Sequence, residues 1–280
     1  MGPENSKLST YLRVLSYSVL AFTLAFLINN LFTVWGGWPG IKKVFSHYDL
    51  FGYKQKSLES SDLTYGYIQI LIYVVCILSV IFYVFKTYSQ TLVDDSKILS
   101  KFSAYLIRGS FWAVFLVGLA DFIISFMVVE RLWEAIFSPE VKAFMVKAPE
   151  RITYIHFPII LVSFIIGYFT KSVGFIWLAV LVVLSEFVIV LSRFVFSYEQ
   201  AFQGDLVRFW YAALYLFASA YALIHEGHVR VDVLYSSFSE KKKAWTNMVG
   251  SALLGVPLCL IVLFLGLNGK ASIILSLIHI

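Results

Sequence analysis

Hydrophobic residues in this chain of 280 gather into long runs that are separated by short polar stretches. A helix needs about 20 consecutive apolar residues to cross the hydrocarbon core of a bilayer. The runs are continuous rather than alternating, which favours helices over the strands of a membrane barrel. The pattern therefore predicts an all-α, polytopic transmembrane helix bundle of about seven spans, at residues 11–35, 66–85, 102–129, 154–170, 173–196, 206–224 and 245–266.

Composition strengthens the membrane prediction. Hydrophobic residues make up 60% of the chain and charged residues 14%, and the mean hydropathy is +0.81. A water-soluble domain would have to bury nearly all of this apolar surface, whereas a bilayer removes that requirement. The 26 Phe, 17 Tyr and 7 Trp supply the side chains that membrane proteins place at the lipid–water boundary. Cys76 and Cys259 each lie in an apolar run, which indicates small hydrophobes rather than disulfide partners.

The segments between the predicted spans differ in character. Residues 36–65 form a mixed polar loop. In residues 130–151, charged and apolar positions interleave at a spacing that fits an amphipathic helix on the membrane surface, broken near Pro139 and Pro149, although an irregular loop fits equally well. Only residues 171–172 separate the fourth and fifth runs, so these two spans are expected to form a tight hairpin.

Basic residues in the loops predict the orientation. The loop after the sixth run favours the cytoplasmic side, because it holds Arg230, Lys241, Lys242 and Lys243. Seven spans then place the N-terminus in the cytoplasm as well. No small-residue cleavage site follows the first run, so we expect this span to stay as an anchor. The formal charge of +5 is scattered between the runs, which favours lipid and argues against nucleic acid as a partner.

Some charged residues fall inside apolar runs, where a charge near the bilayer centre costs at least roughly 2.5 kcal/mol. Arg108 and Asp121 lie about 20 Å apart along one helix, so they cannot pair with each other. We expect Arg108 to extend to the nearby interface and Asp121 to make a structural contact with another helix. Glu186 and Arg193 share a face of the fifth run, where a third helix could bridge them.

One polar cluster follows the sixth run. His225, Glu226 and His228 could ligate a metal, but their spacing is not the i, i+4 pair of a zinc-protease helix. The alternative, which we favour, is a polar helix end at the membrane interface. We find no catalytic constellation in the chain and predict no cofactor.

Three motifs in the last third of the chain are distinctive: LSRFVFS at 191–197, DLVR at 205–208 and GHVRVDVL at 227–234. They resemble motifs of the small permease subunit, the DctQ type, of tripartite ATP-independent periplasmic (TRAP) transporters. The chain departs from the family pattern at Gly204, where the family has an acidic residue, and at Ser197, where it has glycine. The resemblance carries the family motif onto Arg193, Asp205, Arg208, Gly227, His228, Arg230 and Asp232.

The motif residues have two interpretations. Arg193, Arg208 and Arg230 fit interfacial anchors as well as specific subunit contacts. His228 and Asp232 fit a role in fixing the turn after the sixth helix better than a direct role in transport.

The resemblance divides the chain in two. Residues 1–172 correspond to an N-terminal extension with about four transmembrane helices, and residues 173–280 to a DctQ-like core. The family core has four helices, of which only three are expected here. The last six residues, 275–280, also match the translation of a transposon-derived sequencing adaptor, so we expect the reading frame to have run off a DNA fragment.

The resemblance implies a subunit without enzymatic activity in the bacterial inner membrane. Its partners would be a large permease subunit of the DctM type and a periplasmic solute-binding protein of the DctP type. Transport would be driven by an ion gradient, usually of sodium, and the solutes would be organic anions such as carboxylates. The small subunit would act as scaffold, and the four extra helices would pack on the large subunit or widen that scaffold.

Two other functional classes stay open. One is a membrane-embedded enzyme with a metal at His225, Glu226, His228 and Asp232. The other is a self-sufficient carrier or channel, although such proteins more often show paired helix interruptions near the midplane, and here only Pro257 interrupts a late run.

Overall fold

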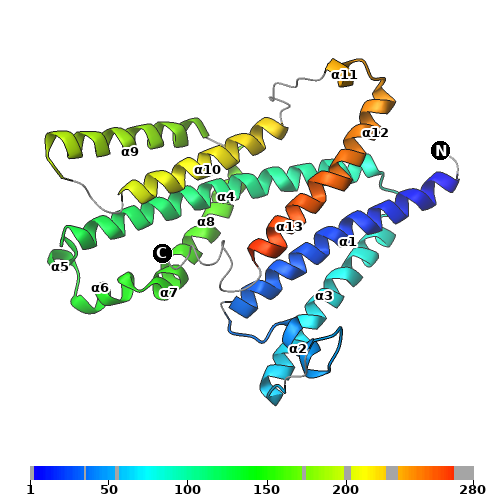
Figure 1. The fold of residues 1–280 in the computed structure, drawn as a ribbon, viewed down its shortest axis with the longest axis horizontal. Coiled ribbons are helices and arrows are strands. Elements are labelled where there is room, and N and C mark those ends of the chain that lie inside the picture. Colours follow the sequence, from blue (N-terminus) through cyan, green and yellow to red (C-terminus); the bar gives the residue numbers. More distant parts are fainter. Residues whose placement is uncertain are drawn as a thin grey trace. The chain divides into compact units, whose positions relative to one another are not determined.

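A computed structural model describes residues 3–34, 36–53, 57–171, 175–198, 203–224 and 233–267 of the chain. These residues form helices joined by turns and contain no strand (Figure 1). The predicted all-α class is therefore confirmed. In chain order the helices are α1 Pro3–Val34, α2 Ile41–His47, α3 Ser60–Lys86, α4 Leu92–Val129, α5 Trp133–Ile136, α6 Pro139–Val146, α7 Ala148–Arg151, η1 Ile152–His156, α8 Phe157–Phe169, α9 Phe175–Val195, α10 Gln203–Ile224, α11 Val233–Ser236, α12 Glu240–Gly250, η2 Ser251–Gly255 and α13 Val256–Gly266.

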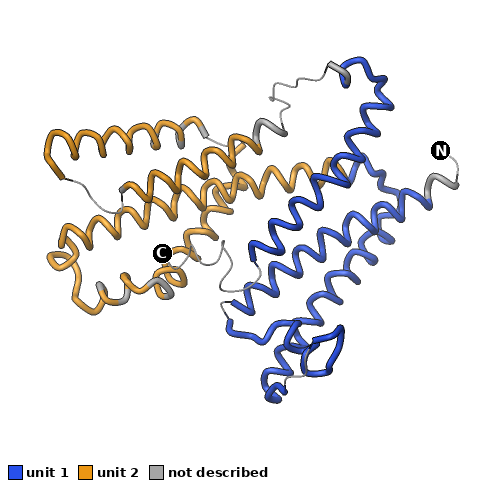
Figure 2. The backbone as a smooth tube through the Cα atoms, in the orientation of Figure 1, with its two compact units in different colours: residues 1–95, 232–280 blue, residues 96–231 orange. Residues whose placement is uncertain are grey.

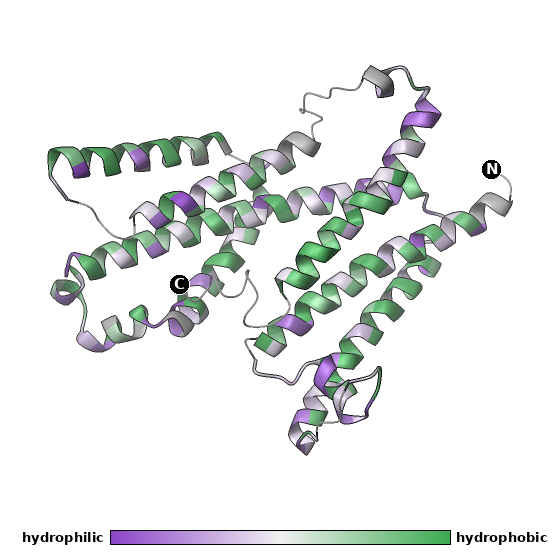
Figure 3. Cartoon of the chain, viewed as in Figure 1, coloured by the Kyte–Doolittle hydropathy of each residue, from purple (hydrophilic) through white to green (hydrophobic). Residues whose placement is uncertain are grey.

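Five helices in the described residues are long and apolar enough to cross a membrane: Lys7–Val34, Ser60–Lys86, Leu92–Val129, Ile152–Phe169 and Glu240–Gly266. Their hydrophobic residues run along most of each helix, as the colouring of α8 and α13 in Figure 3 illustrates. The other two predicted spans form α9 and α10, which have 21 and 22 residues. The chain is therefore a multi-pass membrane protein, and the count of seven spans stays a prediction.

Helix α4 begins ten residues before the predicted span, and its polar start has a local cause. Thr91 and Asp94 form a capping box, in which the amide of Asp94 donates to Thr91 Oγ1 (3.3 Å) and the amide of Thr91 donates to Asp94 Oδ2 (3.1 Å). With 38 residues, α4 is about 57 Å long and extends well beyond the hydrocarbon core.

The two longer connections are more structured than the sequence suggests. Residues 36–65 contain the short helix α2. Residues 130–151 form three short helices that are separated near Pro139 and Pro149, where the predicted amphipathic helix was expected to break. Pro139 starts α6 because a proline fits the first turn of a helix. Similarly, Pro257 follows the π-helical turn η2 and the helix continues through it.

The chain forms two compact units (Figure 2). The first unit comprises residues 1–95 and 232–280, and the second comprises residues 96–231. These limits differ from the division at residue 172 that the family resemblance suggests, because the units reflect contacts rather than homology. The division at 172 stays a prediction.

A fully buried glutamine in the first unit links α1, α3 and the start of α2. Gln69 of α3 accepts a hydrogen bond from the amide of Gly40 at 2.9 Å, and its own amide donates to Thr33 Oγ1 of α1 at 3.0 Å. Gly40 directly precedes α2 and has a φ of 79°, which glycine adopts without strain. One side chain thus fixes α1, α3 and the start of α2 together.

A buried ion pair joins the other end of the same unit. Arg13 of α1, whose side chain is 2% exposed, donates from Nε to Asp95 Oδ2 at 2.5 Å. The same guanidinium donates to the carbonyl oxygen of Thr87 at 2.7 Å, and the Tyr17 hydroxyl donates to Asp95 Oδ1 at 3.2 Å. Because each charged group has several partners, the pair is a satisfied network that ties α1 to the end of α3 and the start of α4.

We predict that replacing one member of this pair destabilises the chain strongly. Arg13→Leu leaves the buried carboxylate of Asp95 unpaired, which costs about 3–5 kcal/mol. The midpoint of thermal unfolding in detergent should fall, and it should fall less in the double variant with Asp95→Leu. The matched control is Arg208→Leu, because Arg208 pairs with Asp205 while 85% exposed and should change little. Equal midpoints for Arg13→Leu and the control would refute the prediction.

Candidate functional site

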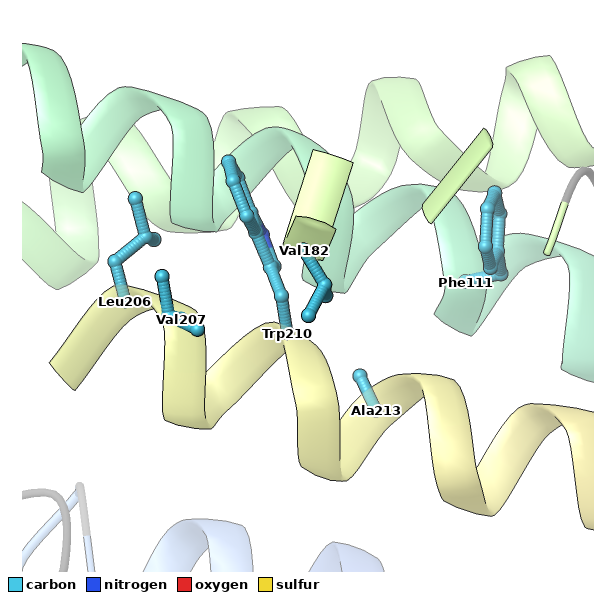
Figure 4. Close-up of a cluster of buried hydrophobic side chains, with 6 residues drawn as sticks. All are labelled: Phe111, Val182, Leu206, Val207, Trp210 and Ala213. Atoms are coloured by element: carbon cyan, nitrogen blue, oxygen red, sulfur yellow. The ribbon is translucent and has the colours of Figure 1, made fainter. Parts of the chain in front are cut away.

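The motif-bearing helices α9 and α10 pack on α4, which belongs to the predicted extension. A cluster of buried hydrophobic side chains joins the three helices: Phe111 of α4, Val182 of α9, and Leu206, Val207, Trp210 and Ala213 of α10. Figure 4 shows Trp210 extending from α10 toward α4, with Val182 beside it. The helices that resemble the family core thus share a hydrophobic core with the helix that precedes them.

Trp210 approaches α4 at a glycine. A Cβ atom added to Gly118 would lie 2.6 Å from the indole nitrogen of Trp210, so any larger residue there would displace the ring. The same ring is nearly parallel to that of Phe115, with centroids 6.2 Å apart. Small residues at such crossings let membrane helices pack closely.

A second close crossing joins α4 to α8. A Cβ atom on Gly167 would lie 2.8 Å from the backbone of Gly109. Beside this crossing, Arg108 Nε donates to the carbonyl oxygen of Gly167 at 3.1 Å, and Tyr105 donates to the carbonyl oxygen of Phe164 at 3.3 Å. Arg108, which we expected to extend to the interface, therefore contacts a helix end. The carbonyl of Gly167 lies in the last turn of α8, where helices leave acceptors unpaired.

Asp121, the other predicted intramembrane charge on α4, contacts two basic residues. His156 Nε2 lies 2.8 Å from Asp121 Oδ1, and Arg151 Nε lies 3.3 Å from the same oxygen. Both partners lie at the start of the fourth span, in η1 and α7. We did not single them out from the sequence, although a search for basic residues in or next to the other apolar runs would have found them.

The family-motif residues lie mostly on the surface of the described part of the chain. Asp205 and Arg208 pair with each other at 3.4 Å in the first turns of α10, and their side chains are 68% and 85% exposed. Arg193 and Glu186 are exposed on α9. Four motif residues, Gly227, His228, Arg230 and Asp232, lie outside the described residues, as do His225 and Glu226 of the suggested metal site.

Exposed ion pairs such as that of Asp205 and Arg208 contribute little to stability. The pair of Asp205 and Arg208 therefore adds little to the stability of the second unit, whereas Asp121 and Arg108 join α4 to the helices before and within the fourth span.

A comparison with protein-family models identifies the last third of the chain. Residues 180–276 match the model described as "Tripartite ATP-independent periplasmic transporters, DctQ component". We call residues 180–276 the DctQ segment because they resemble this component. No curated protein and no solved structure matches the chain. The DctQ segment begins within α9 and includes α10, α12 and α13, so the resemblance read from its motifs is confirmed.

The DctQ segment contributes to both compact units. Helices α9 and α10 lie in the second unit, and α12 and α13 lie in the first. In the first unit, Phe264 of α13 packs edge-to-face on Phe26 of α1, with centroids 4.3 Å apart. Helices of the DctQ segment therefore pack on α1 as well as on α4, and both of these precede the segment in the chain.

We predict that the crossing between α4 and α8 tolerates no added methyl group. Gly167→Ala places a Cβ against the backbone of Gly109, which cannot rotate away, and such overpacking costs about 1–3 kcal/mol. Gly250→Ala is the matched control, because nothing lies within 4 Å of its Cβ position and alanine favours a helix. Tryptophan fluorescence during heating in detergent should show a lower midpoint for Gly167→Ala only. A midpoint for Gly167→Ala as high as that for Gly250→Ala would contradict the close approach of the α4 and α8 backbones.

Proposed function

We propose that this chain is the scaffold-forming small permease subunit of a TRAP transporter, which a sodium gradient drives to take up organic anions such as carboxylates. The family match supports the coarser part of this statement, a small subunit that works with a large permease subunit and a solute-binding protein. The proposed location is the bacterial inner membrane, with the N-terminus in the cytoplasm.

The observation that carries the scaffold role is the exposed carboxylate of Glu186. It lies at the centre of α9, and its neighbours Val183, Phe187 and Val190 are 66%, 57% and 47% exposed. A charge at this depth costs at least roughly 2.5 kcal/mol when it faces lipid. A partner helix that brings a hydrogen-bond donor or a cation would remove that cost. We propose that the large permease subunit supplies this helix.

The packing of the extension on the DctQ helices supports the scaffold role. Helix α4 holds α10 through Gly118 and Trp210 and holds α8 through Gly109 and Gly167. Helices α9 and α10 also carry large exposed apolar side chains, such as Phe194 and Tyr215. An extension that stiffens the DctQ helices widens the scaffold, which is the second of the two roles that we considered for it.

We predict that uptake needs all three components. Proteoliposomes with the chain, its large permease subunit and the binding protein should accumulate radiolabelled carboxylate when a sodium gradient is applied. Proteoliposomes with the chain alone should show no uptake above that of empty vesicles. Uptake by the chain alone would instead identify a self-sufficient carrier, and uptake of the complex without a sodium gradient would contradict sodium coupling.

We also predict that Glu186 contributes to complex formation. Losing a hydrogen bond to a charged group costs about 1.5–3 kcal/mol, which corresponds to a decrease of roughly 10- to 100-fold in the association constant. Glu186→Leu should therefore reduce the large subunit that co-purifies with the tagged chain, whereas Glu186→Gln should retain more of it. Glu240→Leu is the control, since Glu240 is 93% exposed at the polar start of α12. A yield for Glu186→Leu that equals the control would count against this contact.

A further inference from the structure

The first unit contains a cavity of about 700 Å³ between α1, α3 and the connection that includes α2. This cavity plays no part in the proposed subunit contact. Its apolar end is lined by Phe22, Phe26, Ile70, Tyr73 and Val74, and its polar end by Asn29, Asn30, Thr33, Lys42 and Lys43. Phe22 and Thr33 are about 16 Å apart along α1. The lining therefore changes from hydrocarbon-like to polar over the distance between the membrane interior and its surface.

The polar end offers groups that suit a hydroxylated phosphate headgroup. The side-chain atoms Asn29 Oδ1 and Asn30 Nδ2 are buried and make no hydrogen bond within the described part of the chain. Buried polar atoms in proteins are normally paired, so these two point to a partner other than the described residues. The exposed side chains of Lys42 and Lys43 bring two positive charges to the same end.

The apolar end is bordered by the DctQ segment. Phe264 of α13 packs on Phe26 and Phe22, with ring centroids 4.3 Å and 6.0 Å away. These two phenylalanines also line the cavity. A molecule in the cavity would therefore contact side chains that α13 holds in place.

We propose that this cavity binds an anionic phospholipid with a hydroxyl-bearing headgroup, of which phosphatidylglycerol is the simplest example. The phosphate accepts hydrogen bonds from Asn30 and the lysines, a headgroup hydroxyl donates to Asn29, and an acyl chain lies along Phe22 and Phe26. A soluble phosphate would leave the apolar end empty. A zwitterionic lipid would bring its own cation to the two lysines, where like charges repel.

Native mass spectrometry of the purified full chain tests this proposal. The chain is exchanged into detergent with equal amounts of phosphatidylglycerol and phosphatidylcholine, and the retained lipids are counted. Wild type should retain phosphatidylglycerol preferentially. In the double variant Lys42→Gln, Lys43→Gln, the ratio of retained phosphatidylglycerol to phosphatidylcholine should fall by about 5- to 30-fold. This is the decrease expected for one or two lysine contacts with an anionic lipid. Lys241→Gln, Lys242→Gln removes the same charge from α12 and should keep the preference.

A second pair of variants tests the apolar end. Ile70→Trp fills the cavity and should lower the retention of phosphatidylglycerol, whereas Leu71→Trp adds the same ring at an exposed neighbour that does not line the cavity. Millimolar glycerol 3-phosphate should not displace the lipid. Equal retention of the two lipids by wild type, equal loss in both lysine variants, or displacement by glycerol 3-phosphate would each overturn the proposal.

Discussion

Lipid tails are as apolar as leucine, so helices in a bilayer gain little from hiding hydrophobic side chains against each other. They associate where backbones come close and where polar groups find partners, and α4 provides both. Gly109 admits the backbone of α8, and Gly118 admits Trp210 of α10. Nine residues at 100° each place the two glycines on opposite faces of α4. The second unit is therefore organised around one helix with a notch on each side.

This arrangement changes how the extension relates to the DctQ segment. An appended domain would have its own core and few contacts with the rest of the chain. Here Phe111 of α4 belongs to the same buried cluster as Val182 of α9 and Leu206 of α10. In the first unit, α1 contacts α13 through the phenylalanine pair Phe26 and Phe264. Residues before the family match thus complete the packing of the helices within it.

The sequence predicted the helices well and the contacts poorly, for physical reasons. Runs of apolar residues identify membrane helices because the bilayer thickness sets their length. That length does not show which helices meet, so the ion pair of Arg13 and Asp95, which are 82 residues apart, was not foreseen. Asp121 stood out as a charge in an apolar run, yet its partner His156 could be named only from coordinates. The start of α4 was missed because a capping box extends a helix without any hydrophobic signal.

Charges within the helices fall into two kinds, and the difference bears on function. The carboxylate of Asp95 is buried and accepts hydrogen bonds from Arg13 and Tyr17, so it is paired within one unit. The carboxylate of Glu186 is exposed among apolar side chains at the middle of α9. Hydrocarbon solvates such a charge poorly, and for this reason we propose that a partner helix brings a donor to it. A subunit that must find a partner within the membrane gains specificity from such a group, because purely apolar surfaces cannot distinguish the partner from lipid.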